Sequence, residues 1–166
     1  MPGAKPRVPP PHDPQQIFLN GHNFGEAARM LFAAAPQDPS VIAPACAVAA
    51  LATELLLKSL IAYEGVYNVP RSHDLDRLYG LIDPATKDKL ETQWDELMAL
   101  PEMALRLKDS PSHQMELGAC LADSRNAFDN YRFIYDPSRH VTFTVGSLPH
   151  LLRHIILSMH PDWRPS

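Results

Sequence analysis

The sequence predicts an all-α protein, an antiparallel helical bundle of about five to six helices with a short extended arm. Three observations support this prediction. Apolar residues recur at helical spacing through most of the chain. Asp-Pro pairs at 38–39 and 83–84 are typical of helix starts, where aspartate caps and proline occupies the first turn. Strand-like alternation is confined to VTFTV at 141–145.

The composition is that of one folded domain. The chain has 166 residues, of which 45% are apolar and 20% charged, and this is enough to bury a single core. Residues 1–16 are rich in proline, which fixes φ and lacks a backbone donor, so we expect a flexible tail there. We therefore expect residues 17–162 to form the single helical domain.

The predicted helices follow one another through the chain. The second is the strongest, because it is apolar nearly all round apart from a few polar residues that include Glu54 and Lys58, and we expect it to be central. In the third, Ser72 is the expected cap and Asp74 lies in the first turn. The helices are expected at 20–35, 38–65, 72–82, 83–98, about 114–135, and 148–160.

The arm is expected over residues 139–146. Asp136-Pro137 should stop the preceding helix, and the alternating VTFTV segment has no obvious partner strand in this chain. We expect this arm to be extended and to pair with a second subunit.

Charge and cysteine content exclude several classes of protein. A net charge of -4 with a pI near 6.0 argues against coating nucleic acid through a large basic surface, although a local basic pocket is compatible with it. Cys46 and Cys120 lie in apolar stretches and are predicted to be buried, reduced thiols.

The N-terminus has no apolar signal region, so a cytoplasmic location without membrane spans is expected. No Walker loop, dinucleotide fingerprint or nucleophile elbow occurs.

Three segments carry a family resemblance. They are ATELLLKSLIAYEG at 52–65, HDLDRLYGLI at 73–82 and SRNAFDNYRFIYD at 124–136. In this order and spacing they resemble the HEPN (higher eukaryotes and prokaryotes nucleotide-binding) family, over roughly residues 20–160. The resemblance implies a helical homodimer that binds RNA or a nucleotide. It also implies, for ribonuclease members, cleavage of RNA without a metal or other cofactor by an arginine, a polar residue and, four to six residues later, a histidine.

The ribonuclease motif is only half present. Arg125 and Asn126 match its first half, but Arg132 occupies the histidine position. Arginine stays protonated and cannot act as a base, so Arg132 could only bind or stabilise negative charge. Because Arg125 and Arg132 are seven residues apart, one helix would place them on nearly the same face, with Asn126 beside them. Such a face could hold a phosphate or a carboxylate.

The candidate site residues also have structural interpretations. A buried arginine often pairs with a carboxylate of the next helix, and Glu54 is the expected partner. His73 and Asp74 could form an acid-base device, but capping of a helix start is favoured. His150 and His154 are one turn apart, yet they lie off the apolar stripe and lack the glutamate of the zinc protease motif, so a solvated face is favoured over a metal site.

Three functional hypotheses follow. The first is a HEPN-like homodimer without intact ribonuclease chemistry that binds RNA, a nucleotide or a partner protein, with candidate ligand-binding residues Arg125, Asn126, Arg132, Glu54, His73 and Asp74. The second is an active metal-independent ribonuclease of a toxin-antitoxin type system, with His73 or His140 as a displaced base and an antitoxin as partner. The third is an accessory subunit of a nucleotidyltransferase.

Overall fold

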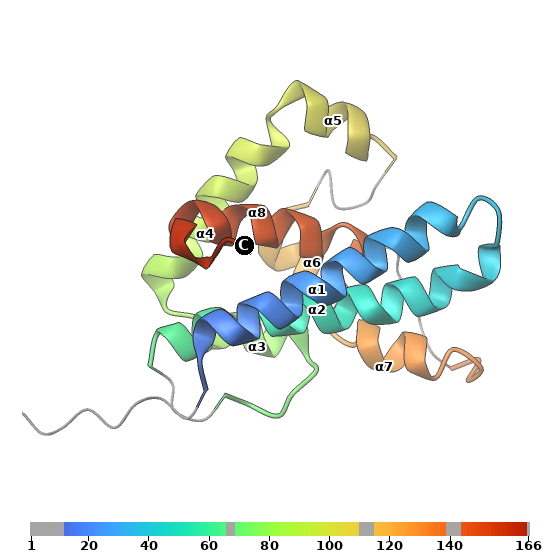
Figure 1. The fold of residues 1–166 in the computed structure, drawn as a ribbon, viewed down its shortest axis with the longest axis horizontal. Coiled ribbons are helices and arrows are strands. Elements are labelled where there is room, and N and C mark those ends of the chain that lie inside the picture. The colour runs from blue at the N-terminus through green and yellow to red at the C-terminus, as the bar shows by residue number, and fades with distance from the viewer. Residues whose placement is uncertain (1–11, 66–68, 110–114, 139–143, 166) are drawn as a thin grey trace, which may run out of the picture.

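The computed structural model describes residues 12–65, 69–109, 115–138 and 144–165 (Figure 1). Within these ranges the chain is helical and contains no strand, which confirms the predicted all-α class. The elements are α1 (Pro14–Ala34), η1 (Pro39–Val41), α2 (Ile42–Tyr63), α3 (Leu75–Leu81), α4 (Pro84–Met98), α5 (Pro101–Leu107), α6 (Leu117–Asp123), α7 (Ala127–Arg132), η3 (Thr144–Gly146), α8 (Leu148–Met159) and η4 (Pro161–Trp163), where η denotes a short 3-10 helix.

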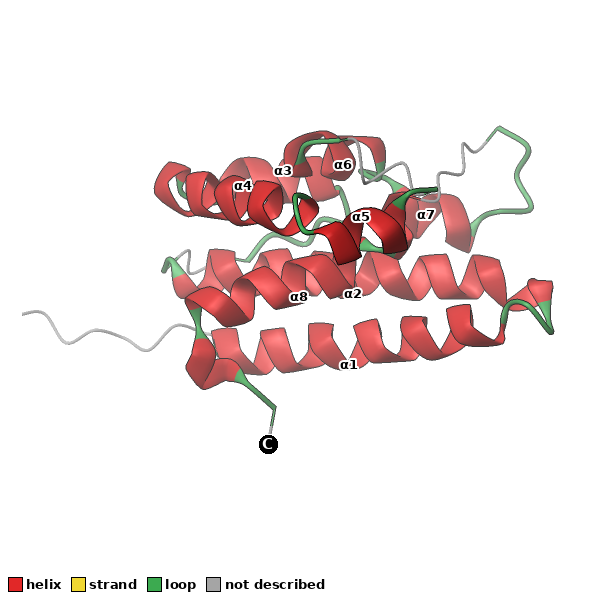
Figure 2. Cartoon of the chain, turned by 90° about the horizontal axis from the view of Figure 1, so that it is seen from above, coloured by secondary structure: helices red, strands yellow, loops and turns green. Residues whose placement is uncertain are grey.

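The two long helices α1 and α2 form an antiparallel hairpin (Figures 1 and 2). Asp13 caps α1 by accepting the amide of Gln15, so residues 14–16 belong to α1 and not to the tail predicted for 1–16. Asp38 caps η1 in the same way, as its Asp-Pro pair predicts. Gly65 lies just beyond α2 with φ +86°, a conformation that favours glycine at a helix end.

α2 is the central helix. Figure 2 shows α1 on one side of α2, α8 beside α2, and α3, α4, α6 and α7 on the other side. α2 contacts α1, α3, α7 and α8, and its buried residues lie all round it, as predicted. The 25 residues 39–63 are long and apolar enough to cross a membrane by length and composition, and a central position in the core accounts for the same apolar composition.

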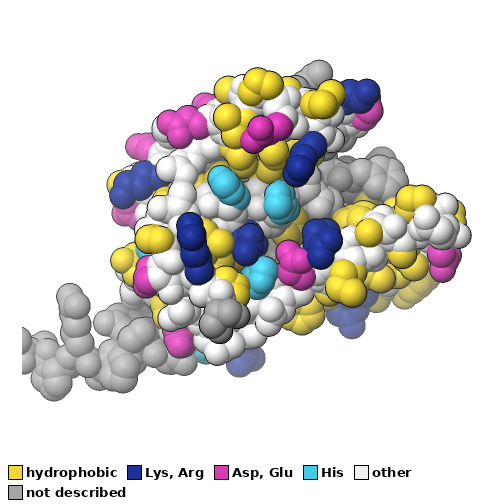
Figure 3. All heavy atoms as spheres, turned by 45° about the horizontal axis from the view of Figure 1, so that its top comes forward, with side chains coloured by type: hydrophobic (Ala, Val, Ile, Leu, Met, Phe, Trp, Pro, Cys, Tyr) yellow, Lys and Arg dark blue, Asp and Glu magenta, His cyan; other side chains and the backbone are white. Residues whose placement is uncertain are grey.

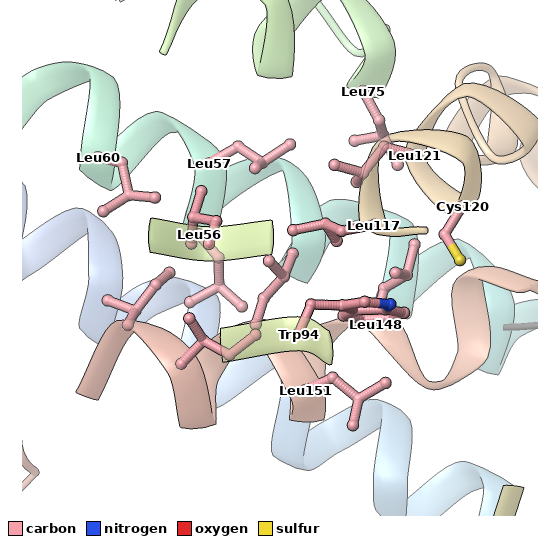
Figure 4. Packing of buried hydrophobic residues seen from close by; sticks show 14 of the residues in the cluster. Leu56, Leu57, Leu60, Leu75, Trp94, Leu117, Cys120, Leu121, Leu148 and Leu151 are labelled. Carbon is pink, nitrogen blue, oxygen red and sulfur yellow. The ribbon is translucent and has the colours of Figure 1, made fainter. Parts of the chain in front are cut away.

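The core forms where α2, α4, α6 and α8 meet (Figure 4). Leucines of α2 lie among apolar side chains of the other three helices, and Trp94 of α4 is fully buried in this group. The indole N–H of Trp94 donates to the carbonyl of Met115 at 3.0 Å, so its one polar atom is satisfied. Cys46 and Cys120 are both buried and form no disulfide, as predicted.

The helix predicted over about 114–135 is wrong in one respect, because the chain breaks it into α6 and α7. Ser124 leaves the helical conformation with ψ near 8°, and residues 124–126 form a turn. A tertiary contact lies at the break, where the carbonyl of Arg125 accepts the amide of Leu75 at 3.0 Å. Glu91 of α4 accepts the amides of Leu117 and Gly118 and so caps the other end of α6, its start.

The predicted arm lies mostly outside the described residues, which omit 139–143. Its described end, Thr144–Gly146, is the 3-10 helix η3 and not an extended strand. The hydroxyl of Thr144 donates to Asp123 at 2.6 Å and holds η3 against the end of α6. The short helix α5 was not predicted; it begins at Pro101 and buries Met103.

Candidate functional site

The site begins with a buried carboxylate on the central helix. Glu54 of α2 is only 3% exposed. One carboxylate oxygen accepts the ammonium of Lys58 at 2.5 Å, and the other lies 2.6 Å from Nδ1 of His73. Glu54 and Lys58 are in the favourable i, i+4 order on α2. A buried charge is tolerated only when it is paired in this way.

His73 lies between this carboxylate and helix α7. Its imidazole stacks on the ring of Phe128, with the centroids 4.8 Å apart and the planes at 28°. Because a paired carboxylate only accepts, Nδ1 of His73 must carry the proton that joins it to Glu54. Nε2 is then the proton-accepting nitrogen of the neutral ring, on a side chain that is 48% exposed.

Asp74, the next residue, is both a cap and an ion-pair partner. Its carboxylate accepts the amide of Arg77 at 3.0 Å, so Asp74 and not Ser72 is the N-cap of α3. The other oxygen accepts the guanidinium of Arg125 at 2.7 Å. Burial raises the pKa of Asp74, but the hydrogen bonds from Arg125 and Arg77 and the charge of Arg125 outweigh it, and the pKa falls below its ordinary value of 3.8.

Arg125 does not pair with Glu54, and that prediction is wrong. The break between α6 and α7 places Arg125 at the start of α3, where it bonds Asp74 and approaches Asp76 at 3.7 Å. Its partner is nevertheless a carboxylate from another helix, as the prediction expected. The side chain of Arg125 is still 49% exposed, so part of its guanidinium faces solvent.

Arg125 and Arg132 do not share a helix face, because they belong to different elements. Asn126 occupies the N-cap position of α7, is exposed, and makes no side-chain capping bond. Arg132 is exposed in the last turn of α7, with its guanidinium carbon 5.1 Å from the ring centroid of Phe133. It lies four residues beyond Phe128, and therefore on the side of α7 that carries the ring stacked on His73.

We call Glu54, Lys58, His73, Asp74 and Arg125 the His73 site. It combines an exposed imidazole, fixed by a buried carboxylate, with a neighbouring guanidinium that keeps its charge at any ordinary pH. Such a pair can bind a phosphate and can transfer a proton. Among the described residues no group of three His, Cys, Asp or Glu side chains could hold a metal ion.

Sequence reasoning missed two features. The first is the stacking of His73 on Phe128, and no local signal connects these two residues. A second set of polar side chains gathers where α1 meets α8, and includes His22, His150 and Arg153. The spacing of His150, Arg153 and His154 places all three on one side of α8 and is the signal that could have indicated this set.

Comparison of the chain with models of known protein families, with curated proteins and with solved structures finds no match. The resemblance to HEPN proteins therefore rests on the three sequence segments at 52–65, 73–82 and 124–136.

Proposed function

We propose that this chain is a HEPN-like homodimer that binds RNA or a nucleotide through the His73 site, without the arginine-histidine pair of the ribonuclease members. The all-α class agrees with the fold that the resemblance implies. The residues quoted for the resemblance lie close together as well. Glu54, His73 and Arg125 come from its three segments and meet in one site.

The observation that carries this proposal is the 2.6 Å contact between Glu54 and His73. It holds an exposed imidazole in place beside the turn that carries Arg125. When both ring nitrogens of His73 carry a proton, Nε2 donates to a phosphate oxygen, and the guanidinium of Arg125 binds phosphate oxygens with charge-assisted hydrogen bonds. Arg132, on the Phe128 side of α7, adds a further positive charge near the same ring.

The surroundings also set the expected strength of binding. Arg125 is already paired with Asp74, and Asp76 is near, so a phosphate must compete with two carboxylates for this guanidinium. The chain carries a net charge of -4. We therefore expect weak binding that falls with added salt, with a shallow slope because few phosphates are contacted.

A binding measurement tests the proposal. Fluorescence anisotropy of a labelled, mixed-sequence single-stranded RNA at low salt should show binding by the wild type. Arg125→Ala should weaken it about tenfold, the cost of losing charge-assisted hydrogen bonds. Arg77→Ala is the matched control, because Arg77 is an exposed arginine of the same region whose side chain lies outside the site. Equal losses in both variants, or none in either, would reject the His73 site as the binding site.

The same contact favours a second function, cleavage of RNA without a metal. A carboxylate on Nδ1 orients an imidazole for proton transfer at Nε2, which suits His73 to take the proton of a 2′-hydroxyl as that oxygen attacks phosphorus. The bond from phosphorus to the 5′-oxygen breaks in the same reaction, and water donates a proton to that leaving oxygen. Incubation of a mixed RNA pool with the protein in EDTA tests this. Cleavage by the wild type that is lost in His73→Gln and in an Arg125→Ala/Arg132→Ala double variant would establish it. Folded variants that cleave as well as the wild type would exclude this site.

The homodimer is tested independently. Sedimentation velocity at micromolar concentration should give twice the mass of the 18.5 kDa chain. A species at the mass of one chain would contradict this part of the proposal and leave the binding measurement unaffected.

A further inference from the structure

A small pocket lies between α1 and α8, on a different side of α2 from the His73 site. Its volume is about 140 Å³, and its polar lining consists of His22, Glu26, Arg29, His150 and Arg153. Figure 3 shows histidine and arginine or lysine side chains gathered on one face of the molecule, with fewer acidic groups among them. A protein with a net charge of -4 thus concentrates positive and ionisable groups around one cavity.

Two buried polar atoms of this lining have no partner among the described residues. They are Nδ1 of His22 and Nε of Arg153. Nε of Arg153 is only a donor, so it requires an acceptor, and Nδ1 of His22 becomes a donor when the ring is protonated. Buried polar groups are nearly always paired, so these two atoms have hydrogen-bonding capacity for a group that enters the pocket.

The charged side chains that line the pocket carry a net positive charge. Glu26 is its acidic group, and that carboxylate accepts a hydrogen bond from Arg29 at 2.9 Å. Arg153 makes no ion pair within the described part of the chain. Burial and the charge of Arg153 lower the pKa of His22 below 6.5, partly opposed by Glu26.

His150 is in a similar position. Burial lowers its pKa below 6.5, the positive charges of Arg153, His154 and Arg106 lower it further, and Glu26 opposes them. The pKa values of both histidines are thus lowered first by burial and then by neighbouring positive charge, and an anion in the pocket would oppose the effect of that charge.

The size of the pocket limits the ligand. Sites for drug-sized molecules typically measure about 300–1,000 Å³, so 140 Å³ has room for one small group and not for a nucleotide. The pocket also lies at the first turn of α8, whose positive dipole end favours anions. A single oxyanion such as a phosphoryl group fits the volume, the charge and the unpaired donors.

A second hollow also has Arg153 in its lining. It is lined further by His154 and Leu157 of α8, with Arg164 beyond the end of η4. Arg153 therefore borders both hollows.

We infer that the pocket between α1 and α8 is a phosphoryl-binding site, in which Arg153 and His22 donate to the phosphate oxygens. The phosphoryl group belongs either to a small phosphorylated molecule or to the end of a nucleic acid strand, and the chemistry of recognition is the same for both. This site is independent of the His73 site and requires none of its residues.

The test uses inorganic phosphate and the full chain. Isothermal titration calorimetry, with sodium chloride of equal ionic strength as the reference, should show phosphate binding by the wild type. Arg153→Gln should weaken binding about tenfold or more, since a charge-assisted donor is lost. Lys89→Gln is the control, because Lys89 is an exposed cation on α4, outside the pocket. Arg153→Lys keeps the charge without the guanidinium donors and should bind between the wild type and Arg153→Gln.

Side-chain NMR provides a second readout. Phosphate should raise the pKa of His22 and His150 in the wild type and not in Arg153→Gln. No phosphate effect beyond that of chloride, or an equal effect in Arg153→Gln and the wild type, would overturn the inference. In an Arg125→Ala variant, phosphate should still raise the pKa of His22 and His150, although RNA binding is weakened. This result would separate the pocket from the His73 site.

A last comparison identifies the source of the phosphoryl group. Tighter binding of a 5′-phosphorylated dinucleotide than of its 5′-hydroxyl form, dependent on Arg153, supports the site and assigns it to a nucleic acid end. If inorganic phosphate binds as tightly as the phosphorylated dinucleotide, the site is supported and its ligands are small phosphorylated molecules. Equal binding of the two dinucleotides without dependence on Arg153 counts against a phosphoryl site.

Discussion

Asp74 uses one carboxylate for two tasks. One oxygen caps α3 through the amide of Arg77, and the other bonds the guanidinium of Arg125 in the turn before α7. The carbonyl of Arg125 in turn accepts the amide of Leu75, so the start of α3 and the α6 to α7 break are joined by two hydrogen bonds. The same residues thus serve the fold and the proposed phosphate site.

Substitutions of Asp74 distinguish the contribution of the helix cap to stability from that of the ion pair. Asp74→Ala should lower the free energy of unfolding by about 1 kcal/mol through loss of the cap. Asp74→Asn should lose less, because asparagine also caps helices well. Urea unfolding at neutral pH measures both. If Asp74→Asn is as unstable as Asp74→Ala, the ion pair and not the cap dominates.

The pH dependence follows from the lowered pKa of Asp74. A carboxyl whose pKa is lower in the folded state stabilises that state above its unfolded pKa of about 3.8, and this contribution is lost as pH falls through the folded pKa. The stability difference between wild type and Asp74→Asn should therefore be present at neutral pH and disappear in acid. A difference that persists below the folded pKa would contradict this account.

Glu54 is the buried member of the His73 site, and its charge has two partners. Glu54→Gln leaves the ammonium of Lys58, which is largely buried, without a counter-charge. Removal of one member of a buried pair is strongly destabilising, and we expect a loss of about 2–3 kcal/mol in the free energy of unfolding. Glu54→Gln combined with Lys58→Met should recover part of this loss. RNA binding should not recover in the double variant, because His73 still lacks its carboxylate.

At the scale of helices, α1 packs on α2 through a small-residue contact. A Cβ added at Gly21 would lie 3.1 Å from Cγ of Leu56 and 3.2 Å from Cβ of Leu55, both tighter than ordinary contact. At Gly25 the nearest atom, Cβ of Pro149, would lie at 3.4 Å. The two glycines are one turn apart on the same helix, so they form a matched pair.

Alanine at both positions gains the same helix propensity, about 1 kcal/mol over glycine. Gly25→Ala should therefore stabilise the protein, whereas Gly21→Ala also forces α1 away from α2 at an overpacking cost of about 1–3 kcal/mol. Thermal unfolding should place Gly25→Ala above Gly21→Ala, with Gly21→Ala at or below the wild type. The reverse order would mean that α1 and α2 do not approach closely at Gly21.

Helix caps and faces could be predicted from sequence because they depend on neighbouring residues. Asp38, Asp83 and Gly65 mark the ends that they predict. The break at 124–126 could not be predicted from sequence. Buried residues on either side of it keep a helical spacing across it, namely Leu117, Leu121 and Tyr131. The contact at the break comes from Leu75, which is distant in sequence and donates its amide to the carbonyl of Arg125.

The same limit applies to the candidate site. Glu54, His73, Asp74 and Arg125 were all identified by residue type and resemblance, and the structure brings them together. Their pairing was not predictable, because an unbroken helix would have aimed Arg125 elsewhere. The pocket between α1 and α8 was missed because His22 and Arg153 are far apart in sequence and neither belongs to a motif.

In the whole molecule, α2 separates two regions of different chemistry. The His73 site involves α2, α3 and α7, and the pocket between α1 and α8, here called the Arg153 pocket, is lined mainly by residues of those two helices. Figure 2 shows α1 on one side of α2 and α3 with α7 on the other. Neither site shares a residue with the other. Single substitutions can therefore address one site at a time, and effects on the two sites should add.

Three histidines connect stability to pH across the molecule. The pKa values of His22, His150 and His160 are lowered from 6.5, in each case mainly by burial. A histidine whose pKa is lower in the folded state binds a proton more readily when unfolded. Between the folded and unfolded pKa values the unfolded state therefore holds more protons, so the free energy of unfolding rises with pH and falls as pH drops below about 6.5.

Phosphate should change this dependence selectively. If it binds in the Arg153 pocket, it raises the pKa of His22 and His150, so the loss of stability between about pH 7.5 and 5.5 should become smaller in phosphate than in chloride. His160 lies away from the pocket, stacked on Trp163 at 4.3 Å, and its contribution should persist. Urea unfolding of the wild type and of His160→Gln across this range, in both salts, measures the two effects. His160→Gln should reduce the slope equally in phosphate and chloride, whereas a phosphate effect that vanishes in His160→Gln would place the anion beside His160 and not beside Arg153.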